Sequence, residues 1–136
     1  MSSREHFEEV LAESPYAQLL GVEMQEDEQG LFFVLPFQPH NIGNDQLPAL
    51  HGGVIGGFLE TAALLHLVSL RESEELPRTV DFSVDYLRSG RGEPLYARCS
   101  VTKHGKRVAN VLMTAWQDDP AKPVAVARAH FLLSAR

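Results

Sequence analysis

The segment that decides the fold begins His51-Gly52-Gly53-Val54-Ile55-Gly56-Gly57-Phe58-Leu59-Glu60 and stays almost continuously apolar as far as Val68. It carries Glu60 and His66, and it is shorter than the ~20 apolar residues that a bilayer span needs. A helix that is apolar nearly all round is buried inside a globular core. We therefore expect a long central helix over residues 52–70, with the rest of the chain folded around it.

The composition is that of an ordinary soluble domain. The chain has 136 residues, of which 44% are hydrophobic and 22% charged, and this length suits one domain spanning residues 1–136. Twelve Lys and Arg against 18 Asp and Glu give a net charge of −6. Because no stretch is strongly basic, neither nucleic acid nor a membrane surface is expected as a main partner.

The cysteine count and the N-terminus restrict the chemistry and the compartment. Cys99 is the only cysteine, which excludes an internal disulfide and a metal site built from several cysteines. The N-terminal residues show neither a secretory signal nor another targeting motif. We expect a cytoplasmic protein without a metal.

Before the central helix, the pattern predicts a helix and two strands. Residues 4–20 form an amphipathic pattern that Pro15 ends or kinks, with a short second turn over residues 16–20. Residues 22–28 and 31–37 flank a plausible hairpin turn at Gln29-Gly30. Residues 38–50 are rich in turn-forming residues and hold no period, so we expect a loop there.

After the central helix, the pattern predicts four strands. Residues 79–87 alternate between two faces, with Val80, Phe82, Val84 and Tyr86 on one and Thr79, Asp81, Ser83 and Asp85 on the other. Residues 95–102, 108–117 and 124–134 follow, separated by short connections. Short connections favour an antiparallel meander, since parallel pairs need long crossovers.

These elements together predict an α+β fold in which a curved antiparallel sheet of five or six strands wraps around one long helix. A single sheet leaves part of the helix uncovered. A second copy of the protein would cover the remainder, so we expect at least a dimer.

The start of the central helix has the features of an anion-binding site. Gly52 and Gly53 leave their N–H groups unshielded by side chains, at the positive end of the helix dipole. Such groups can stabilise a developing oxyanion. Alternatively, the glycines only allow a loop and a strand to pack closely against the helix.

Glu60 is the unusual side chain of this helix, because its neighbours are apolar. It lies at a subunit interface, pairs with a cation or serves a functional pocket, since unpaired burial of a carboxylate is costly. The alternative is a solvated side chain on a narrow exposed stripe. His66 lies away from the face of Glu60 and is interpreted as a core or interface histidine.

These residues resemble those of the hotdog-fold acyl-CoA thioesterases, specifically the phenylacetic-acid-degradation branch. The resemblance rests on His51-Gly52-Gly53, an apolar helix and an acidic residue nine positions after the histidine. It extends to the strand at residues 79–88 and to the turn Lys103-His104-Gly105-Lys106. It covers residues 15–135 and implies the hotdog fold, an acyl-CoA substrate and a homodimer or homotetramer.

The resemblance also implies roles for individual residues. The N–H of Gly53, or of Gly52, would polarise the thioester carbonyl, and His51 would orient that site or only close the loop. Glu60, from the partner subunit, would act as general base or as nucleophile. Thr79 would help to hold the attacking water.

Two positions differ from the family pattern. The substrate-positioning amide is assigned to Asn41, with Asn44 as the alternative, because the loop before His51 is longer here. Many members of the branch have Asp where this chain has Glu60, and the extra methylene moves the carboxylate by ~1.5 Å.

The coenzyme A part of the substrate would need cations for its phosphates, and no other cofactor is expected. The candidates cluster at the ends of the predicted strands, where they either meet the phosphates or only serve solubility and protect the sheet edges: Arg88, Arg91, Lys103, Lys106 and Arg107. The acyl group needs an apolar pocket. Four apolar or aromatic residues either line this pocket or belong to the core: Phe58, Leu59, Phe82 and Tyr86.

The function expected is hydrolysis of an acyl-CoA thioester. One alternative is a hotdog enoyl-CoA hydratase or 3-hydroxyacyl dehydratase, for which the pair of His51 and Glu60 is a poor substitute for the usual acid–base pair. The other alternative is a protein that binds acyl-CoA without catalysis.

Overall fold

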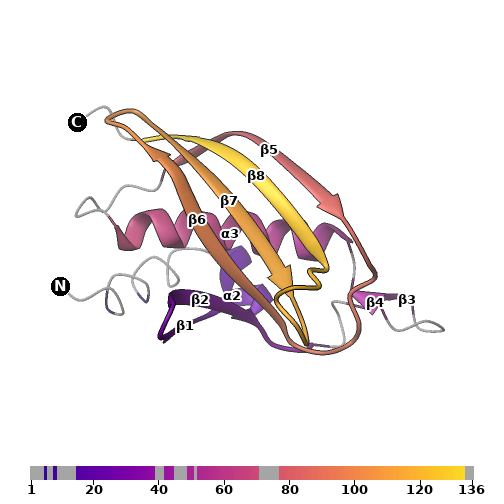
Figure 1. Ribbon diagram of the computed structural model, residues 1–136. Coiled ribbons are helices and arrows are strands. Elements are labelled where there is room, and N and C mark those ends of the chain that lie inside the picture. The colour runs from indigo at the N-terminus through magenta and orange to yellow at the C-terminus, as the bar shows by residue number, and fades with distance from the viewer. Residues whose placement is uncertain are drawn as a thin grey trace.

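The computed structural model describes residues 5, 8, 15–38, 42–44, 49–50, 52–70 and 77–133. A six-stranded antiparallel sheet curls around one long helix, α3 (Gly52–Ser69), as Figure 1 shows. The sheet strands are β1 (Glu23–Asp27), β2 (Gly30–Leu35), β5 (Arg78–Tyr86), β6 (Leu95–His104), β7 (Val108–Trp116) and β8 (Ala125–Leu132). The helix α2 (Pro15–Leu20) and the short strands β3 (Ile42–Asn44) and β4 (Ala49–Leu50) complete the described elements. This arrangement confirms the predicted α+β hotdog fold.

The helix α3 forms the centre of the core. By length and composition it could cross a membrane. Its buried residues instead pack inside the sheet, which makes it the core helix of a soluble fold: Ile55, Phe58, Leu59, Ala62, Ala63, Leu65, Leu67 and Val68. The expectation of a buried central helix is confirmed.

The inner face of the sheet is lined largely by alanine, which explains how the strands come so close to α3. Each of six alanines on β6, β7 and β8 is at most 5% exposed: Ala97, Ala109, Ala115, Ala125, Ala127 and Ala129. The helix supplies large side chains in return, with Phe58, Leu59 and Leu67 fully buried. Small residues on the concave face and large ones on the helix fill the limited space at close packing density.

The strand order differs from the predicted meander in one respect. The order is β1-β2-β6-β7-β8-β5, so that only β6, β7 and β8 follow one another as a meander. β5 pairs with β8 at the edge of the sheet, and β6 pairs with β2 instead of β5. The prediction failed because short connections do not specify partners, and the segment 87–94 crosses the end of the sheet before β6 begins.

A β-bulge changes the predicted faces at the beginning of β5. Thr79 pairs with Phe131 and Asp81 with His130, and the register shifts between them. The extra residue leaves Val80 62% exposed, whereas Thr79 is half-buried on the helix side. The prediction of faces is therefore wrong for these two residues, and it is correct from Asp81 to Tyr86.

The N-terminal part of the chain follows the prediction with small changes. β1 and β2 form the expected hairpin, whose turn is Glu28-Gln29, and Gly30 adopts a φ of 112° that favours glycine. Pro15 begins α2, as proline commonly does in a first helical turn. Most of residues 1–14 lie outside the described residues. The expected loop over residues 38–50 contains the antiparallel pair β3–β4, in which Ile42 pairs with Leu50.

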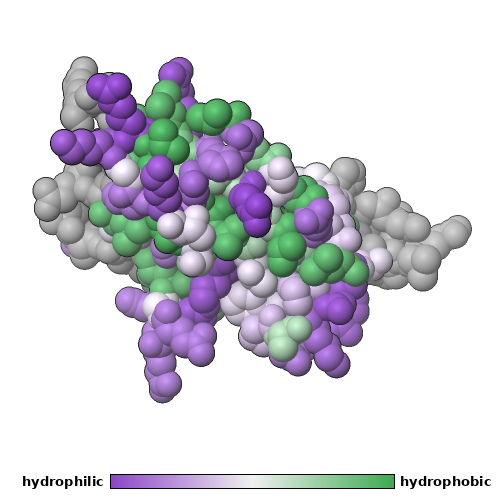
Figure 2. All heavy atoms as spheres, turned by 45° about the horizontal axis from the view of Figure 1, so that its top comes forward, coloured by the Kyte–Doolittle hydropathy of each residue, from purple (hydrophilic) through white to green (hydrophobic). Residues whose placement is uncertain are grey.

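The outer face of the sheet carries mixed polar and apolar residues, as Figure 2 shows. Arg98 joins two hairpins there, with Nη1 and Nη2 donating to Asp27 at 3.1 and 2.6 Å. Its guanidinium also lies 5.5 Å from the ring centroid of Phe32 and 6.0 Å from that of Trp116. The Arg98 hydrogen bonds lower the pKa of the Asp27 carboxyl below its usual value.

His66 is the polar side chain that α3 turns into the interior. Its ring meets that of Phe33 edge-on at 6.5 Å, and its buried Nδ1 has no hydrogen-bond partner among the described residues. Burial lowers the pKa of His66 below its usual value of 6.5, because the charged form loses hydration. The ring thus packs against the core, as a core histidine would, but within the described part of the chain its Nδ1 lacks the hydrogen-bond partner that such a residue is expected to have.

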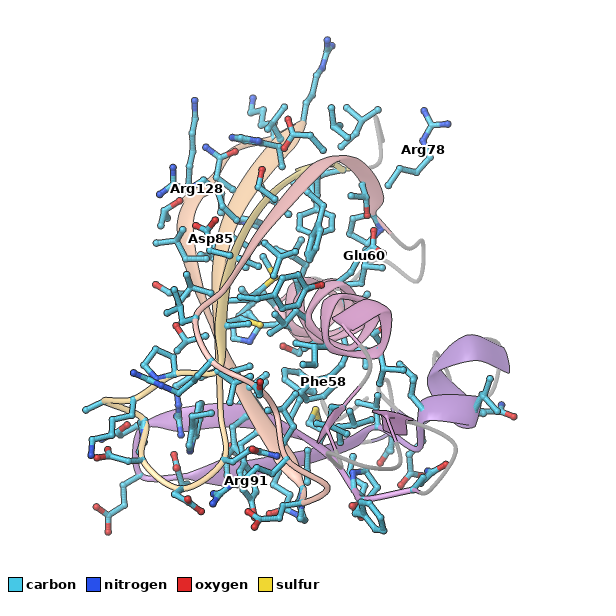
Figure 3. The ribbon with its side chains drawn as sticks, turned by 90° about the vertical axis from the view of Figure 1, so that its right-hand side faces the viewer. Phe58, Glu60, Arg78, Asp85, Arg91 and Arg128 are labelled. Atoms are coloured by element: carbon cyan, nitrogen blue, oxygen red, sulfur yellow. The ribbon has the colours of Figure 1, made fainter. Side chains whose placement is uncertain are left out.

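Replacement of Ala129 by leucine should test the packing of α3 against the sheet. The added side chain has no room on the concave face, so we expect the free energy of unfolding to fall by ~1–3 kcal/mol in urea denaturation. Arg128→Leu places the same side chain on the outer face of β8, where Figure 3 shows Arg128, and should change it by less than ~0.5 kcal/mol. Equal effects of the two substitutions would contradict this packing.

The lowered pKa of His66 predicts a specific loss of stability in mild acid. Below the usual value of 6.5 the unfolded chain binds a proton that the folded chain excludes, so the free energy of unfolding falls as the pH falls. His66→Leu should flatten this dependence between about pH 6.5 and 5, above the range of ordinary carboxylates. Urea denaturation at several pH values measures it, and an unchanged slope in the variant would disprove the assignment.

Candidate active site at the start of the central helix

A cavity of about 340 Å³ lies at the N-terminal end of α3. Leu50, Gly52 and Ile55 form one wall, and Tyr86 with residues 87–90 forms the other. The first-turn N–H groups and the positive end of the helix dipole lie at this end of α3. Gly53 makes a further interaction of its own within the chain. The cavity therefore combines an apolar wall with the positive end of a helix dipole, which attracts negative charge.

Tyr86 connects the end of β5 to the first turn of α3. Its hydroxyl donates a hydrogen bond of 2.7 Å to the carbonyl oxygen of Gly52. A Cβ atom at Gly56 would lie 3.3 Å from the Tyr86 hydroxyl and 3.9 Å from the Phe82 ring. Gly56 thus allows β5 to lie close against α3, whereas a Cβ at Gly52 would stay at an ordinary 3.7 Å from the Tyr86 ring; the close-packing interpretation is supported for Gly56.

Gly90 brings the segment 87–94 against the same end of α3. Its carbonyl oxygen accepts a 2.7 Å hydrogen bond from the N–H of Leu50. A Cβ atom at Gly90 would lie 3.3 Å from both Leu50 and Ile55. A larger residue at this position would push the segment away from the cavity.

The other side of the segment 87–94 is attached to the turn between β7 and β8. Gln117 accepts a hydrogen bond from the N–H of Arg91 at 2.9 Å and donates to the carbonyl oxygens of Arg91 and Glu93. Arg91 pairs with Asp118, and Arg88 Nη1 donates to the carbonyl oxygen of Pro123 at 2.8 Å. The wall of the cavity is therefore held from two sides.

Glu60 lies on α3 outside this cavity. It is half-buried, and no described residue forms a hydrogen bond or ion pair with its carboxylate. In Figure 3, which looks along α3, Glu60 projects on the side of Arg78, whereas Phe58 lies on the opposite side of the helix. Gly53 shares the face of Glu60 but lies seven residues earlier, a separation of ~10 Å along the axis.

The structure brings some of the predicted site residues together and separates others. Gly52, Gly53 and Arg88 lie at the start of α3, and Phe82 lies against Gly56. Thr79 is on the inner face of β5 at the beginning of the strand, whereas the cavity lies at the end of the strand. His51 and Asn41 lie outside the described residues, as does the side chain of Asn44, whose backbone pairs with Ala49.

The predicted cluster of cations divides between the two ends of the sheet. Arg88 follows β5 beside the β7–β8 turn, whereas Lys103 and Lys106 lie at the β6–β7 turn. Successive turns of an antiparallel meander fall at opposite ends of its strands. Lys103 and Lys106 are therefore remote from Arg88 and from the start of α3 in the same chain, and their contact with coenzyme A stays a prediction.

Residues whose role the sequence left open are now assigned. Phe58 and Leu59 are fully buried and belong to the core, whereas Tyr86 is 51% exposed at the cavity. Burial raises the pKa of the Cys99 thiol to about 12, so this group is not a nucleophile near neutral pH.

Sequence reasoning missed the residues that hold the wall of the cavity. The hydroxyl of Tyr86 and the amide of Gln117 both act over long sequence separations. The alternation of residues 79–87 placed Tyr86 on the inner face, but nothing local indicated its bond to Gly52. Gln117 carries no local signal, because its partners lie about 25 residues away.

Comparison with known proteins agrees with this geometry. The model of the thioesterase superfamily matches residues 47–124. The chain is 37% identical to the medium/long-chain acyl-CoA thioesterase YigI of Escherichia coli in an alignment 110 residues long, and the match covers 70% of this chain and 70% of that one. It is 57% identical to a Chromobacterium violaceum protein of known structure, with a TM-score of 0.77 and coverage of 97% of this chain and 92% of that one.

A third relative was solved with CoA. This Bacillus halodurans protein is 25% identical, has a TM-score of 0.75, and the match covers 98% of this chain and 93% of that one. The family match spans the start of α3, the whole of α3 and the strands β5, β6 and β7. The chain belongs to the thioesterase superfamily and has its hotdog fold.

Proposed function

We propose that this protein hydrolyses acyl-CoA thioesters with medium or long acyl chains. The cavity at the start of α3 carries the proposal, because it joins an apolar wall to a helix N-terminus. The similarity to YigI supports acyl-CoA as the substrate class, and the CoA bound to the Bacillus halodurans relative supports coenzyme A as the carrier.

The start of α3 would stabilise the charge that forms during hydrolysis. When water attacks the thioester carbonyl, the oxygen becomes an oxyanion, and the N–H groups of Gly52 and Gly53 would hold it. The C–S bond then breaks, the acyl group leaves as the carboxylic acid, and coenzyme A leaves as the thiol. His51, with Asn41 or Asn44, would position the thioester from the loop before the helix.

Glu60 of the partner subunit would remove the proton from the attacking water. Gly53 and Glu60 of one chain are ~10 Å apart along α3, too far to act on one carbonyl carbon. Antiparallel pairing of two helices around a twofold axis would place the middle of one beside the start of the other. A carboxylate without a partner on a half-buried face fits such an interface.

The edge strand β5 is the surface through which the two copies would pair. No other described strand pairs with its outer edge, and Val80 and Leu87 are more than half exposed there and just beyond its end. Pairing of β5 with its copy would continue the sheet across the dimer. Thr79, on the inner face of this strand, would then help to hold the water near the interface.

Glu60→Gln tests the proposed base. The substitution keeps the shape of the side chain and removes its ability to accept a proton, so kcat for octanoyl-CoA should fall roughly 10²–10⁴-fold. Thiol release measures the rate, and circular dichroism and gel filtration should show unchanged folding and oligomeric state. A variant with wild-type kcat would rule out this role, and enoyl-CoA hydration without thiol release would favour a hydratase.

Mixed dimers test whether the site is shared between subunits. Gly53→Pro removes one N–H from the first turn, where proline is tolerated, and it should inactivate the protein. Combining Gly53→Pro with Glu60→Gln chains would restore one intact site in each mixed dimer, because each chain supplies what the other lacks. No recovery in purified mixed dimers would mean that both residues act within one chain.

Tyr86→Phe tests the contribution of the cavity wall. The ring stays against Gly52 and Gly56, but the hydrogen bond to the Gly52 carbonyl is lost. If this hydrogen bond stabilises the transition state by about 1 kcal/mol through the alignment of the helix start, its loss lowers kcat/KM roughly fivefold. Steady-state kinetics measures it, and unchanged kinetics would show that the bond does not align the helix start.

A further inference from the structure

A second cavity continues from the first along the segment 87–94. Its volume is about 290 Å³, and it lies between this segment and the β7–β8 turn, with Lys122 and Asp119 on its wall. Arg88 and Ser89 line both cavities. A ligand that reaches the helix start through the first cavity therefore finds a second concave site directly beyond Arg88.

The two cations that remain available in this site are Arg88 and Lys122. The third, Arg91, is already paired with Asp118 and with Glu93 at 3.2 Å. Arg88 uses Nη1 to bind the Pro123 carbonyl and keeps further N–H donors in its guanidinium. The Lys122 ammonium has no hydrogen-bond or ion-pair partner within the described part of the chain.

Hydrogen bonds of the backbone order the segments that carry both cations. The N–H of Lys122 donates to the Asp119 carbonyl at 2.9 Å, and the Asp119 carboxylate accepts the N–H of Ala121 at 2.9 Å. The N–H groups of Leu87 and Arg88 donate to the Val124 carbonyl. A site whose backbone is already ordered binds its ligand at a smaller entropic cost.

We propose that this second cavity, which we call the Lys122 site, binds the phosphate groups of the coenzyme A nucleotide through Lys122 and Arg88. The inference rests on the proposed function and adds where the anionic end of the substrate lies. A concave site of this size suits one end of a nucleotide better than the flat surface of an acidic carrier protein. Lys122 is the residue that nothing in the sequence pattern had indicated.

The test compares three thioesters that differ only beyond the thiol arm: octanoyl-CoA, octanoyl-3′-dephospho-CoA and octanoyl-pantetheine. Lys122→Glu should raise KM for octanoyl-CoA about tenfold with little change in kcat, because a charge-assisted contact becomes a repulsion. The effect should be smaller for the dephospho substrate and absent for octanoyl-pantetheine. Asp119→Asn keeps the oxygen that caps Ala121 and removes a negative charge, so it should lower KM for octanoyl-CoA.

Arg128→Glu is the matched control, since it makes the same change of charge on the exposed outer face of β8. It should leave KM for octanoyl-CoA unchanged. An equal effect of Arg128→Glu and Lys122→Glu, or an equal effect of Lys122→Glu on all three thioesters, would overturn the Lys122 site. Stronger impairment of an acyl-carrier-protein substrate than of octanoyl-CoA would overturn it in favour of a protein partner.

Calorimetric binding of free coenzyme A and 3′-dephospho-CoA separates this proposal from the proposed function. Weaker binding of coenzyme A to Lys122→Glu supports the Lys122 site even if no thioester is hydrolysed, which would refute only the proposed function. Hydrolysis of octanoyl-CoA with equal affinities of wild type and variant for coenzyme A would refute only the Lys122 site.

Discussion

The close packing of α3 against a sheet face lined by alanine is the constraint on which the rest of the structure depends. Six alanines let the strands curl around the helix, and the large side chains of α3 fill the space that remains. The sheet encloses the apolar side of α3. We therefore expect polar groups of the helix at its start or on the side that faces away from the sheet. Glu60 and Gly53 both lie on that side, and His66 is the exception, because burial against the core lowers the pKa of its ring.

The segment 87–94 transmits this packing to the candidate site. It touches Leu50 and Ile55 through Gly90 on one side, and it is held by Gln117 and Asp118 on the other. The two cavities on either side of Arg88 therefore share one wall, whose position is set by hydrogen bonds to the backbone of elements far apart in the sequence.

Within the described part of one chain, the candidate site lacks a carboxylate close enough to the start of α3. A helix start can hold developing negative charge, but the carboxylate on the same face lies too far along the axis to serve it. The face of α3 that carries Glu60 and the edge of β5 with which no other described strand pairs lie on adjoining parts of the molecule, as Figure 3 shows for Glu60 and Arg78 at the beginning of β5. Assembly of two copies would pair the edge of β5 and would bring a partner to the carboxylate of Glu60.

Local pattern by itself determined the central helix, all six main strands, the glycine-rich helix start and the unusual position of Glu60. Periodicity and turn residues act over a few neighbours, so a single sequence contains them. Only the tertiary structure decided that β5 pairs with β8, that a bulge exposes Val80 and turns Thr79 inward, and that Lys103 and Lys106 lie far from Arg88. These features depend on which strands meet, and that is set by the fit of the whole sheet around α3 rather than by any short segment.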